Sequence, residues 1–374
     1  MTTDADLAGG RLTIDLGALQ RNWGKLRDRS GAAECGAVVK ADAYGCGIEQ
    51  VVPALEKAGC RTFFVAVPQE GISLRAVAPE PACYILNGLF PKAAKALIEN
   101  RLRPVLGSMN QLHLWADAAR IHGAPLPCAL HVDTGMNRLG LSLEELRDAV
   151  ADQDLMAQLD VQLLMTHFAC ADDVDHPKTD VQRAVFDMAA DMLPGVPRSA
   201  ANSAASLQGF GYDLARPGVA MYGGEALNDV DNAMEVVVTL EGRINQIRTV
   251  KKGETVGYGA TETMIRESRI AYLSLGYADG YHRAASHMGV PMREVAAPAR
   301  AAYKGQRLKG VGRISMDLCA FDVTDVPPNE IAEGDWIELF GPNIAVDDVA
   351  RAAGTIGYEL LTGMGRRYSR RYVG

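Results

Sequence analysis

The sequence contains little that would attach it to nucleic acid or to a membrane. Its 374 residues include 38 Lys and Arg against 46 Asp and Glu, which gives a formal net charge of −8 and no general attraction for a polyanion. No run of about 18 apolar residues occurs, so no membrane-spanning helix is expected. The first residues, MTTDADLAGG, lack the apolar centre of a secretory signal. We therefore expect a cytoplasmic protein.

Disulfide and metal frameworks are missing as well. The seven cysteines are an odd number, are widely scattered and form no Cys-x-x-Cys pair. Neither a disulfide framework nor a structural zinc site is expected from such a pattern. The histidines show no metal-ligand spacing. We expect buried thiols in a reducing compartment and no bound metal.

Short apolar runs alternate with amphipathic stretches over residues 11–235. Eight such repeats favour a (β/α)8 TIM-like barrel over an open doubly wound sheet. A dinucleotide-binding fold would need a Gly-x-Gly-x-x-Gly turn after its first strand, and none appears. The predicted strands lie at residues 36–40, 62–67, 82–86, 102–106, 127–133, 162–167, 198–201 and 213–216.

Two of the intervening helices have clear local patterns. Ser142 and Glu145 have the spacing of a capping box, which predicts a helix start. Residues 180–192 carry apolar residues at helical spacing, among them Val181 and Met188.

The pattern changes after residue 235 to strand-like segments separated by turns. These segments lie at 234–250, 269–275, 308–311, 318–323 and 335–339, and a helix is expected near 355–361. We predict an N-terminal arm at 1–10, a barrel at 11–235 and a mainly-β domain at 236–374. The arginines near the end of the chain are interpreted as a solvated terminus, and the 284–306 stretch has no evident use.

Barrel active sites form at the carboxyl ends of the strands, so the residues that follow each run are candidates. Lys40 closes an apolar run, where loss of solvation lowers the pKa of an amine and makes it a nucleophile fit for a Schiff base. A lysine that extends from the rim into solvent is the commoner alternative.

The loops after the seventh and eighth runs are where barrels often hold phosphate. Here they supply Asn202, Ser203 and Gly218, although Asn202 and Ser203 could equally form an ordinary helix N-cap. A lysine imine together with a phosphate site suggests pyridoxal 5'-phosphate. The side chains that would then line its ring are Arg138, His167 and Arg216.

Seven segments in one order resemble those of the alanine racemase family. They cover the chain from about residue 11 to Tyr368. The family's fold, an eight-stranded barrel followed by a C-terminal β domain, agrees with the pattern above. The segments are AVVKADAYGCG, HVDTGMNRLG, ANSAAS, RPGVAMYG, VGYGATE, LGYADGY and GRISMD.

The resemblance implies a pyridoxal-phosphate-dependent isomerase of D-alanine biosynthesis that interconverts L- and D-alanine. Lys40 matches the lysine that holds the cofactor as an aldimine and takes the α-proton of the D-enantiomer. Tyr258 matches the opposing base for the L-enantiomer, contributed by the other subunit. His167 matches the imidazole beside the ring, and Arg216 matches the partner of the pyridine nitrogen.

Further matches concern the substrate and the phosphate. Arg138 and the backbone of Met316 match contacts to the substrate carboxylate, and Tyr277 matches a tyrosine that narrows the entry channel. The phosphate site matches Tyr44, Ser203, Gly218, Val219 and Tyr358. Because Lys40 and Tyr258 fall in different domains, the resemblance implies a homodimer with shared active sites.

An amine and a phenol both start near a pKa of ~10, so both must be lowered to act near neutrality. Burial would lower the pKa of Lys40, and a neighbouring cation would lower that of Tyr258. That cation is either His167 or Arg216. Because arginine does not give up its proton, Arg216 should leave the pyridine nitrogen unprotonated and suppress side reactions such as transamination.

The chain departs from the family at several positions. His131 stands where many relatives carry a lysine, often carbamylated, so we expect a bound anion such as chloride, or a water molecule, beside Arg138. Asn137 stands where glycine is common, and Cys46 where histidine is common. Ser315 stands where cysteine is common, next to the carboxylate contact, and bears on the preference for alanine.

Three alternatives remain open at this point. The first is a broader amino-acid racemase that accepts serine or larger side chains. The second is a decarboxylase of the same architecture, although such enzymes place an acid, not an arginine, against the pyridine nitrogen. The third is a pyridoxal phosphate carrier, which would need neither the C-terminal domain nor Tyr258.

Overall fold

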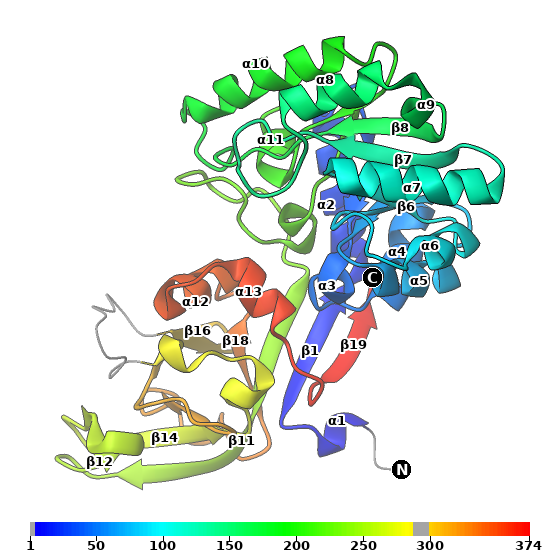
Figure 1. Ribbon diagram of the computed structural model, residues 1–374. Coiled ribbons are helices and arrows are strands. Elements are labelled where there is room, and N and C mark those ends of the chain that lie inside the picture. Colours follow the sequence, from blue (N-terminus) through cyan, green and yellow to red (C-terminus); the bar gives the residue numbers. More distant parts are fainter. Residues whose placement is uncertain (1–3, 287–298) are drawn as a thin grey trace. The chain divides into compact units, whose positions relative to one another are not determined.

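The computed structural model describes residues 4–286 and 299–374 (Figure 1). Most of the 284–306 stretch therefore lies outside the described residues. The chain divides into two compact units, Leu19–Met234 and a second unit that joins Met1–Ala18 to Glu235–Gly374. No helix of the described ranges is long and apolar enough to cross a bilayer.

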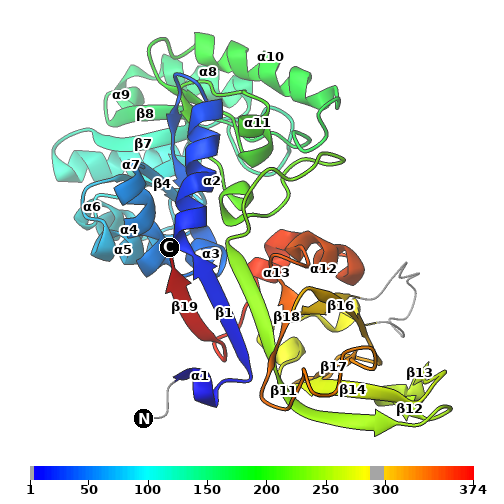
Figure 2. The same cartoon turned by 180° about the vertical axis from the view of Figure 1, so that it is seen from behind.

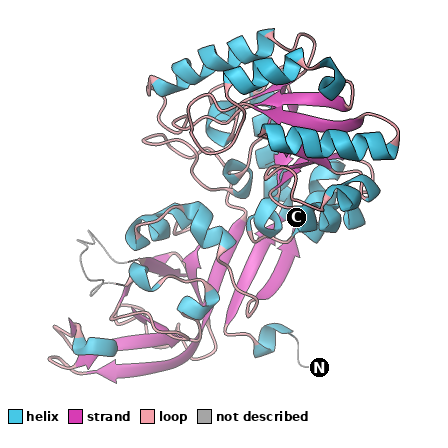
Figure 3. Cartoon of the chain, in the orientation of Figure 1, coloured by secondary structure: helices cyan, strands magenta, loops and turns pink. Residues whose placement is uncertain are grey.

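The unit Leu19–Met234 is a parallel barrel surrounded by helices (Figures 1 and 3). Strands β3 to β9 pair in chain order, and β10 pairs in parallel with β2. The Arg216 N–H donates to the Ala201 carbonyl at 2.9 Å, which joins the last strand to β9 and closes the ring. The strands are β2 (Glu34–Cys35), β3 (Ala37–Val38), β4 (Thr62–Val65), β5 (Ala82–Ile85), β6 (Arg103–Leu106), β7 (Leu126–His131), β8 (Leu159–Met165), β9 (Arg198–Ser199) and β10 (Leu214–Ala215).

These strands form because their sequences are continuous apolar runs, which suit a sheet that is covered on both faces. All four residues of β4 are buried. Each predicted run overlaps one observed strand, and the short strand β2 lies just before the first predicted run, 36–40. The predicted eight-stranded barrel is therefore confirmed.

The helices of this unit begin where their sequences supply caps. The Ser142 hydroxyl accepts from the Glu145 N–H at 3.1 Å while the Glu145 carboxylate accepts from the Ser142 N–H at 2.8 Å, so the predicted capping box is confirmed. The elements are α2 (Leu16–Arg29), α3 (Lys40–Tyr44), α4 (Ile48–Ala58), α5 (Pro68–Val77), α6 (Ala94–Glu99), α7 (Met109–His122), α8 (Leu143–Ala151), α9 (Gln153–Met156), α10 (Lys178–Asp191), α11 (Ser203–Leu207) and the 3-10 turn η1 (Val219–Tyr222).

Helix α10 occurs where a helix is expected, but part of its apolar pattern faces solvent. Val181 is 60% exposed and Met188 is 54% exposed, whereas Gln182 is fully buried. Its inward face combines Phe186 with Gln182, whose amide forms buried hydrogen bonds. Hydrophobic spacing alone therefore misplaces the buried face of this helix.

The second unit is a mainly antiparallel β structure, as predicted for the C-terminal part. Strands β14, β17, β16, β15, β18 and β11 follow one another in the sheet, and β11 also pairs with β14, so the sheet closes on itself. The strands are β1 (Gly10–Asp15), β11 (Val238–Val250), β12 (Thr255–Val256), β13 (Glu262–Thr263), β14 (Ser268–Leu273), β15 (Arg300–Tyr303), β16 (Gln306–Gly310), β17 (Cys319–Asp322), β18 (Trp336–Phe340) and β19 (Ser369–Val373). The helical elements are α1 (Asp4–Leu7), α12 (Val346–Ala353), α13 (Gly357–Thr362) and the 3-10 turns η2 (Tyr258–Ala260), η3 (Tyr277–Asp279) and η4 (Arg283–Ala285).

Both ends of the chain contribute strands to this second sheet. Strand β1 pairs antiparallel with β11 and parallel with β19, and the three run side by side (Figure 2). Residues 11–18, which the sequence places with the barrel, therefore lie in the β unit. The terminal arginines are also more than a solvated end, because Arg370 and Arg371 lie in β19 and Arg367 forms ion pairs with Asp279 and Asp317.

Candidate functional site

Lys40 begins a tight left-handed turn at the carboxyl end of β3. Ala41, Asp42, Ala43 and Tyr44 all have positive φ, between 52° and 54°. This conformation costs a non-glycine residue roughly 1–2 kcal/mol, because Cβ approaches the next carbonyl oxygen. Two side chains hold the turn, since the Asp42 carboxylate accepts from the Ile48 N–H at 2.8 Å and the Glu70 carboxylate accepts from the Ala41 N–H at 2.6 Å.

The environment of Lys40 favours its neutral amine. Burial lowers the pKa of Lys40, and the positive charge of Arg138 lowers it further. The carboxylate of Glu70 acts in the opposite direction and is outweighed. The expected lowering of this pKa is confirmed, and Lys40 is half-buried at the rim.

Ser203, Gly218 and Tyr44 lie together beyond the last two strands. The Ser203 hydroxyl oxygen accepts from the Gly218 N–H at 2.8 Å and from the Ala220 N–H at 3.3 Å, so its proton remains available to an anion. A Cβ at position 218 would lie 2.4 Å from the Tyr44 hydroxyl oxygen, so only glycine fits there. Val219 follows in the buried turn η1.

Asn202 has a structural part in this cluster. Its side-chain oxygen accepts from the Ala205 N–H at 3.0 Å and caps α11. The N-cap interpretation of Asn202 is therefore correct, and the cap fixes the turn on which Ser203 stands.

Arg216 is a buried cation at the centre of the rim. Its guanidinium donates to the Ser199 hydroxyl and to the Thr166 carbonyl. Burial lowers the pKa of Arg216 to about 9, which leaves it charged at neutral pH. A guanidinium has five N–H donors, so these two bonds leave donors for a further acceptor.

Two histidines beside Arg216 are neutral. His167 Nδ1 lies 3.5 Å from the Arg216 Nη2 atom, and burial, followed by the charge of Arg216, lowers the pKa of His167 to about 3. The same two causes, in the same order, lower the pKa of the buried His131 to about 4.

Arg138 ends a loop that is organised around Asp133. One oxygen of the Asp133 carboxylate accepts from the N–H groups of Gly135, Met136 and Asn137 at 2.9 to 3.1 Å. Burial alone would raise the pKa of Asp133, but these three hydrogen bonds together lower it. Asn137 has φ 57°, which accounts for glycine as the common alternative there. Within the described ranges, Arg138 forms no ion pair with a carboxylate.

These residues fit an anionic cofactor. Burial is the sole cause of the lowered pKa of Arg216, so no carboxylate compensates its charge. An uncompensated buried cation is strongly unfavourable unless a bound anion pairs with it. Ser203, Tyr44 and the Gly218 backbone suit a phosphate, and Lys40 suits an aldehyde. In the two described parts of the chain, no cluster of His, Cys, Asp or Glu is suited to a metal ion.

Tyr258 lies in the β unit on an exposed turn between β12 and β13. Its side chain is 67% exposed and borders a pocket of about 350 Å³ that also includes Arg313 and Ser315. A Cβ at Gly259 would lie 3.0 Å from the Arg313 Nη1 atom, so the turn packs closely against that guanidinium. The Ser315 hydroxyl bonds to Leu318 within its own turn.

Met316 and Tyr277 also lie in the β unit, on two loops joined by backbone hydrogen bonds. The Tyr277 N–H donates to the Ser315 carbonyl, and the Ala278 N–H donates to the Met316 carbonyl, each at 3.0 Å. Both side chains are largely exposed, at 54% for Met316 and 41% for Tyr277.

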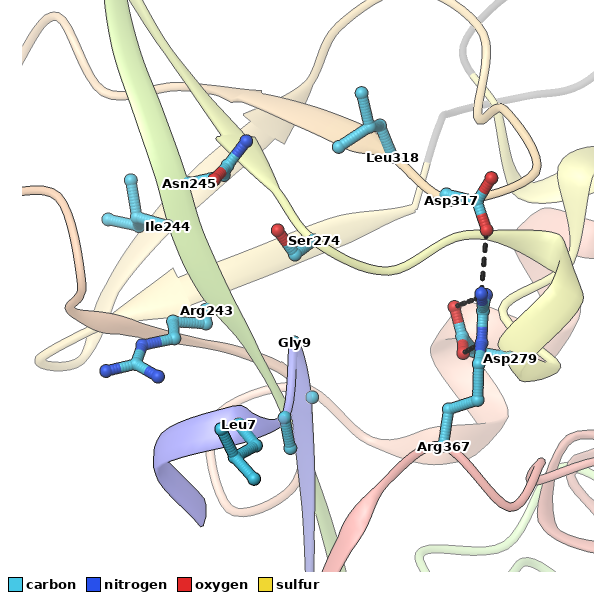
Figure 4. A pocket seen from close by; sticks show the side chains of 12 residues that line it. Leu7, Gly9, Arg243, Ile244, Asn245, Ser274, Asp279, Asp317, Leu318 and Arg367 are labelled. Atoms are coloured by element: carbon cyan, nitrogen blue, oxygen red, sulfur yellow. Dashed lines mark hydrogen bonds and ion pairs between the residues drawn. The ribbon is translucent and has the colours of Figure 1, made fainter. Parts of the chain in front are cut away.

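Arg367 connects the same two loops through ion pairs (Figure 4). It makes two bonds to the buried Asp279, at 2.6 and 2.8 Å, and one to Asp317 at 2.8 Å. Asp317 thus helps to hold Arg367 in place. The pocket bordered by this group has a volume of about 660 Å³.

The structure therefore groups the predicted residues by unit. Tyr358 lies on α13 of the β unit and is half-buried. Sequence reasoning missed Gln182, Glu70 and Arg367, which are polar residues without a motif. The barrel unit holds Lys40, Tyr44, Arg138, His167, Asn202, Ser203, Arg216, Gly218 and Val219, and the β unit holds Tyr258, Tyr277, Met316 and Tyr358.

Comparison with known proteins finds relatives of both units. Residues 14–226 match the family described as alanine racemase, N-terminal domain, and residues 237–372 match alanine racemase, C-terminal domain. The chain is 49% identical over 370 residues to the alanine racemase of Rhizobium meliloti, covering 98% of this chain and 97% of that one. It is 48% identical over 375 residues to the biosynthetic alanine racemase of Agrobacterium fabrum, covering 99% and 96%. A crystal structure of the Bartonella henselae alanine racemase with covalently bound pyridoxal phosphate is similar, with a TM-score of 0.90, 34% identity, and coverage of 98% of this chain and 100% of that chain.

Proposed function

Because this chain belongs to the alanine racemase family and interconverts L- and D-alanine with pyridoxal 5'-phosphate, we propose that Lys40 and Tyr258 are its two catalytic bases. Lys40 takes the α-proton from one face of the substrate and Tyr258 delivers a proton on the other. The observation that carries this assignment is the lowered pKa of Lys40, half-buried beside Arg138.

The barrel residues would hold the cofactor. Ser203, Tyr44 and the backbone of Gly218 and Val219 would bind its phosphate, and Tyr358 would contribute to the same group. When bound, the cofactor would delocalise the negative charge that remains after the α-proton leaves. Arg216, which stays charged, would be the partner of the pyridine nitrogen and would leave it unprotonated.

Loss of the proton from Tyr258 leaves a phenolate, which a nearby positive charge would stabilise. His167 is neutral at pH 7 because its pKa is about 3, whereas Arg216 is charged. Of the two candidates, Arg216 is therefore the cation that we assign to this task, and the neutral His167 acts as a hydrogen-bonding neighbour.

The substrate carboxylate binds to Arg138 and to the backbone N–H of Met316, and Tyr277 narrows the approach. Arg138 has free donors, since it forms no ion pair in the described ranges. The partner that holds Arg138 in place is a chloride ion or a water molecule next to the neutral His131. A crystal grown in bromide should show an anomalous peak or a water there, and a protein carboxylate in contact with Arg138 would contradict this.

A covalent test addresses Lys40 directly. Purified protein should show a visible cofactor absorbance that borohydride abolishes, and peptide mapping should find the label on Lys40. Lys40→Ala should remove both the label and the activity, whereas Lys57→Ala, at an exposed position of α4, should change neither. A colourless protein that ignores added cofactor would refute the assignment.

The second base comes from a partner subunit, so the active form is a homodimer with shared sites. The exposed turn that carries Tyr258 supports this, because a catalytic phenol needs a surface to complete its site. Mixing inactive Lys40→Ala chains with inactive Tyr258→Phe chains should restore about one competent site per heterodimer. Activity that stays at zero after refolding the mixture would argue for sites built within one chain.

A cytoplasmic location is supported by the thiols. All seven cysteines, each in the described ranges, are free, and six are buried. Burial raises the pKa of several, including Cys35 to about 12, which suits unreactive thiols in a reducing compartment. Cell fractionation would test the location.

The alternatives receive less support. The relatives above are named as alanine racemases, and nothing in them favours a broader racemase. A racemisation panel over several L-amino acids would test this point. A decarboxylase would need an acid in place of Arg216, and a simple carrier would need no C-terminal domain, which this chain has.

A further inference from the structure

Gln182 is a polar side chain with no exposed surface, on the inner face of α10. Its amide makes three hydrogen bonds. The nitrogen donates to the Thr134 hydroxyl at 3.1 Å and to the His167 carbonyl at 3.0 Å, and the oxygen accepts from the Ala169 N–H at 2.8 Å.

These bonds join two segments that carry different functional side chains. Thr134 belongs to the loop that runs from Asp133 to Arg138. The His167 carbonyl and the Ala169 N–H belong to the segment that follows β8. Gln182 bridges the two segments through one planar amide, so rotation of that amide would break all three bonds.

A second layer of bonds extends the bridge to Arg216. The Thr134 and Thr166 hydroxyl groups are 2.9 Å apart, and the Thr166 carbonyl accepts from the Arg216 guanidinium at 2.7 Å. The loop is also packed against α10, because a Cβ at Gly135 would lie 3.6 Å from the Lys178 Nζ atom and 3.9 Å from the Gln182 Cγ atom.

We propose that Gln182 is a positioning residue that fixes the Arg138 loop against the segment of His167 and Arg216. Gln182 touches neither substrate nor cofactor. It sets the distance between the group that binds the substrate carboxylate and the groups beside the cofactor ring. This role rests on the function proposed above.

The backbone of the Arg138 loop makes the bridge measurable. The N–H groups of Gly135, Met136 and Asn137 in this loop donate to the Asp133 carboxylate. If Gln182 holds the loop, Gln182→Leu should speed the hydrogen exchange of these three amides, because the loop then opens more often.

The main experiment compares Gln182→Leu with Gln20→Leu. Gln20 is a matched control, because its amide also bonds a backbone carbonyl of the same unit, that of Ala54 at 2.7 Å, on the outer helices. Gln182→Leu should raise KM for L-alanine about tenfold, because a misplaced binding group of this kind costs one to two orders of magnitude. Gln20→Leu should leave KM and kcat within about twofold, and it should cost less thermal stability because Gln20 is half-buried and gives up one hydrogen bond.

A measurement without cofactor separates this proposal from the proposed function. Hydrogen exchange of the Gly135, Met136 and Asn137 amides in the apoprotein should be about tenfold faster in Gln182→Leu and unchanged in Gln20→Leu. If Gln182→Leu does not fold, Gln182→Glu takes its place, because it keeps an oxygen that can accept from the Ala169 N–H but loses the amide nitrogen that donates to Thr134 and to the His167 carbonyl.

Two outcomes would overturn the role of Gln182. One is a Gln182→Leu enzyme with wild-type KM, or a KM no different from that of Gln20→Leu. The other is wild-type hydrogen exchange of the loop amides in the Gln182 variant that folds. A wild-type protein that neither binds pyridoxal phosphate nor racemises alanine would instead refute the proposed function, because hydrogen exchange of the apoprotein needs neither.

Discussion

Replacing Gly218 by alanine probes the packing of the phosphate site. The added methyl group would meet the Tyr44 hydroxyl oxygen at 2.4 Å and the ring carbon that bears it at 3.1 Å. Tyr44 cannot easily retreat, because its buried ring stacks on Tyr222 with the centroids 4.7 Å apart. Overpacking of this kind costs about 1–3 kcal/mol, so the free energy of unfolding of the apoprotein should fall by about 2 kcal/mol.

Two assays follow this change. Urea denaturation of the apoprotein gives the free energy of unfolding without any contribution from the cofactor. An absorbance titration with pyridoxal phosphate gives its affinity, which should fall at least about tenfold, the change that corresponds to 1.4 kcal/mol of lost binding energy. Gly24→Ala serves as the control, because no atom lies within 4 Å of its added methyl group in α2, and alanine should stabilise that helix by about 0.5–1 kcal/mol.

A second substitution checks the assigned cause. In Gly218→Ala combined with Tyr44→Phe, the 2.4 Å contact is gone and the nearest remaining one is 3.1 Å. Most of the lost stability should return, while the cofactor affinity stays low because the hydroxyl donor is missing. The reasoning is refuted if the single variant unfolds and binds as the wild type does, or if the double variant is no more stable than the single one.

Three further predictions concern the rim of the barrel. Ala41→Gly should raise the free energy of unfolding by about 0.5–1 kcal/mol, because it relieves a left-handed residue at a smaller cost in chain entropy. Ala118→Gly is the control, because it lies inside the right-handed α7 and should lower the free energy of unfolding by about 1 kcal/mol. Urea denaturation that ranks the two variants the other way would count against the strained turn. His131 and His167 have folded-state pKa values of about 4 and about 3, below the ordinary 6.5. Between these values the unfolded chain binds more protons than the folded chain. The free energy of unfolding should therefore fall as the pH drops from 6.5 to 4, by up to about 2–3 kcal/mol per pH unit. Urea midpoints of the apoprotein across this range measure the slope, which His131→Asn should reduce by about half. Arg216→Glu should increase the pyruvate formed per alanine inverted, because an acid would protonate the pyridine nitrogen; an unchanged ratio would refute that role.

Much of the barrel could be predicted because its strands are continuous apolar runs, such as Thr62–Val65, bounded by helical stretches. Strand Gly10–Asp15 could not be assigned to its sheet in this way. Its partners begin at Val238 and Ser369, and a local pattern carries no information about so distant a pairing. Proximity along the chain alone places residues 11–18 with the barrel, whereas the structure places them in the β unit.

In the functional site, too, some residues could be predicted from the sequence and others could not. Lys40, Ser203 and Arg216 could be found because the ends of parallel strands converge on one rim. Gln182 could not, because a buried amide is recognised only by partners that come together in the folded chain. The exposed positions of Val181 and Met188 were equally hidden, since helical spacing does not state which side faces inward.

The parallel pairing of Gly10–Asp15 with Ser369–Val373 determines the order in which parts of the chain can fold during translation. The first of these strands leaves the ribosome before the whole barrel, and its partner Ser369–Val373 leaves only after the whole barrel. The barrel can therefore fold during translation, while the Gly10–Asp15 strand still has an unpaired edge. A chain released before residue 369 keeps that edge open, and an open strand edge recruits strands from other molecules. Premature termination should thus yield aggregates seeded by the first segment of the polypeptide.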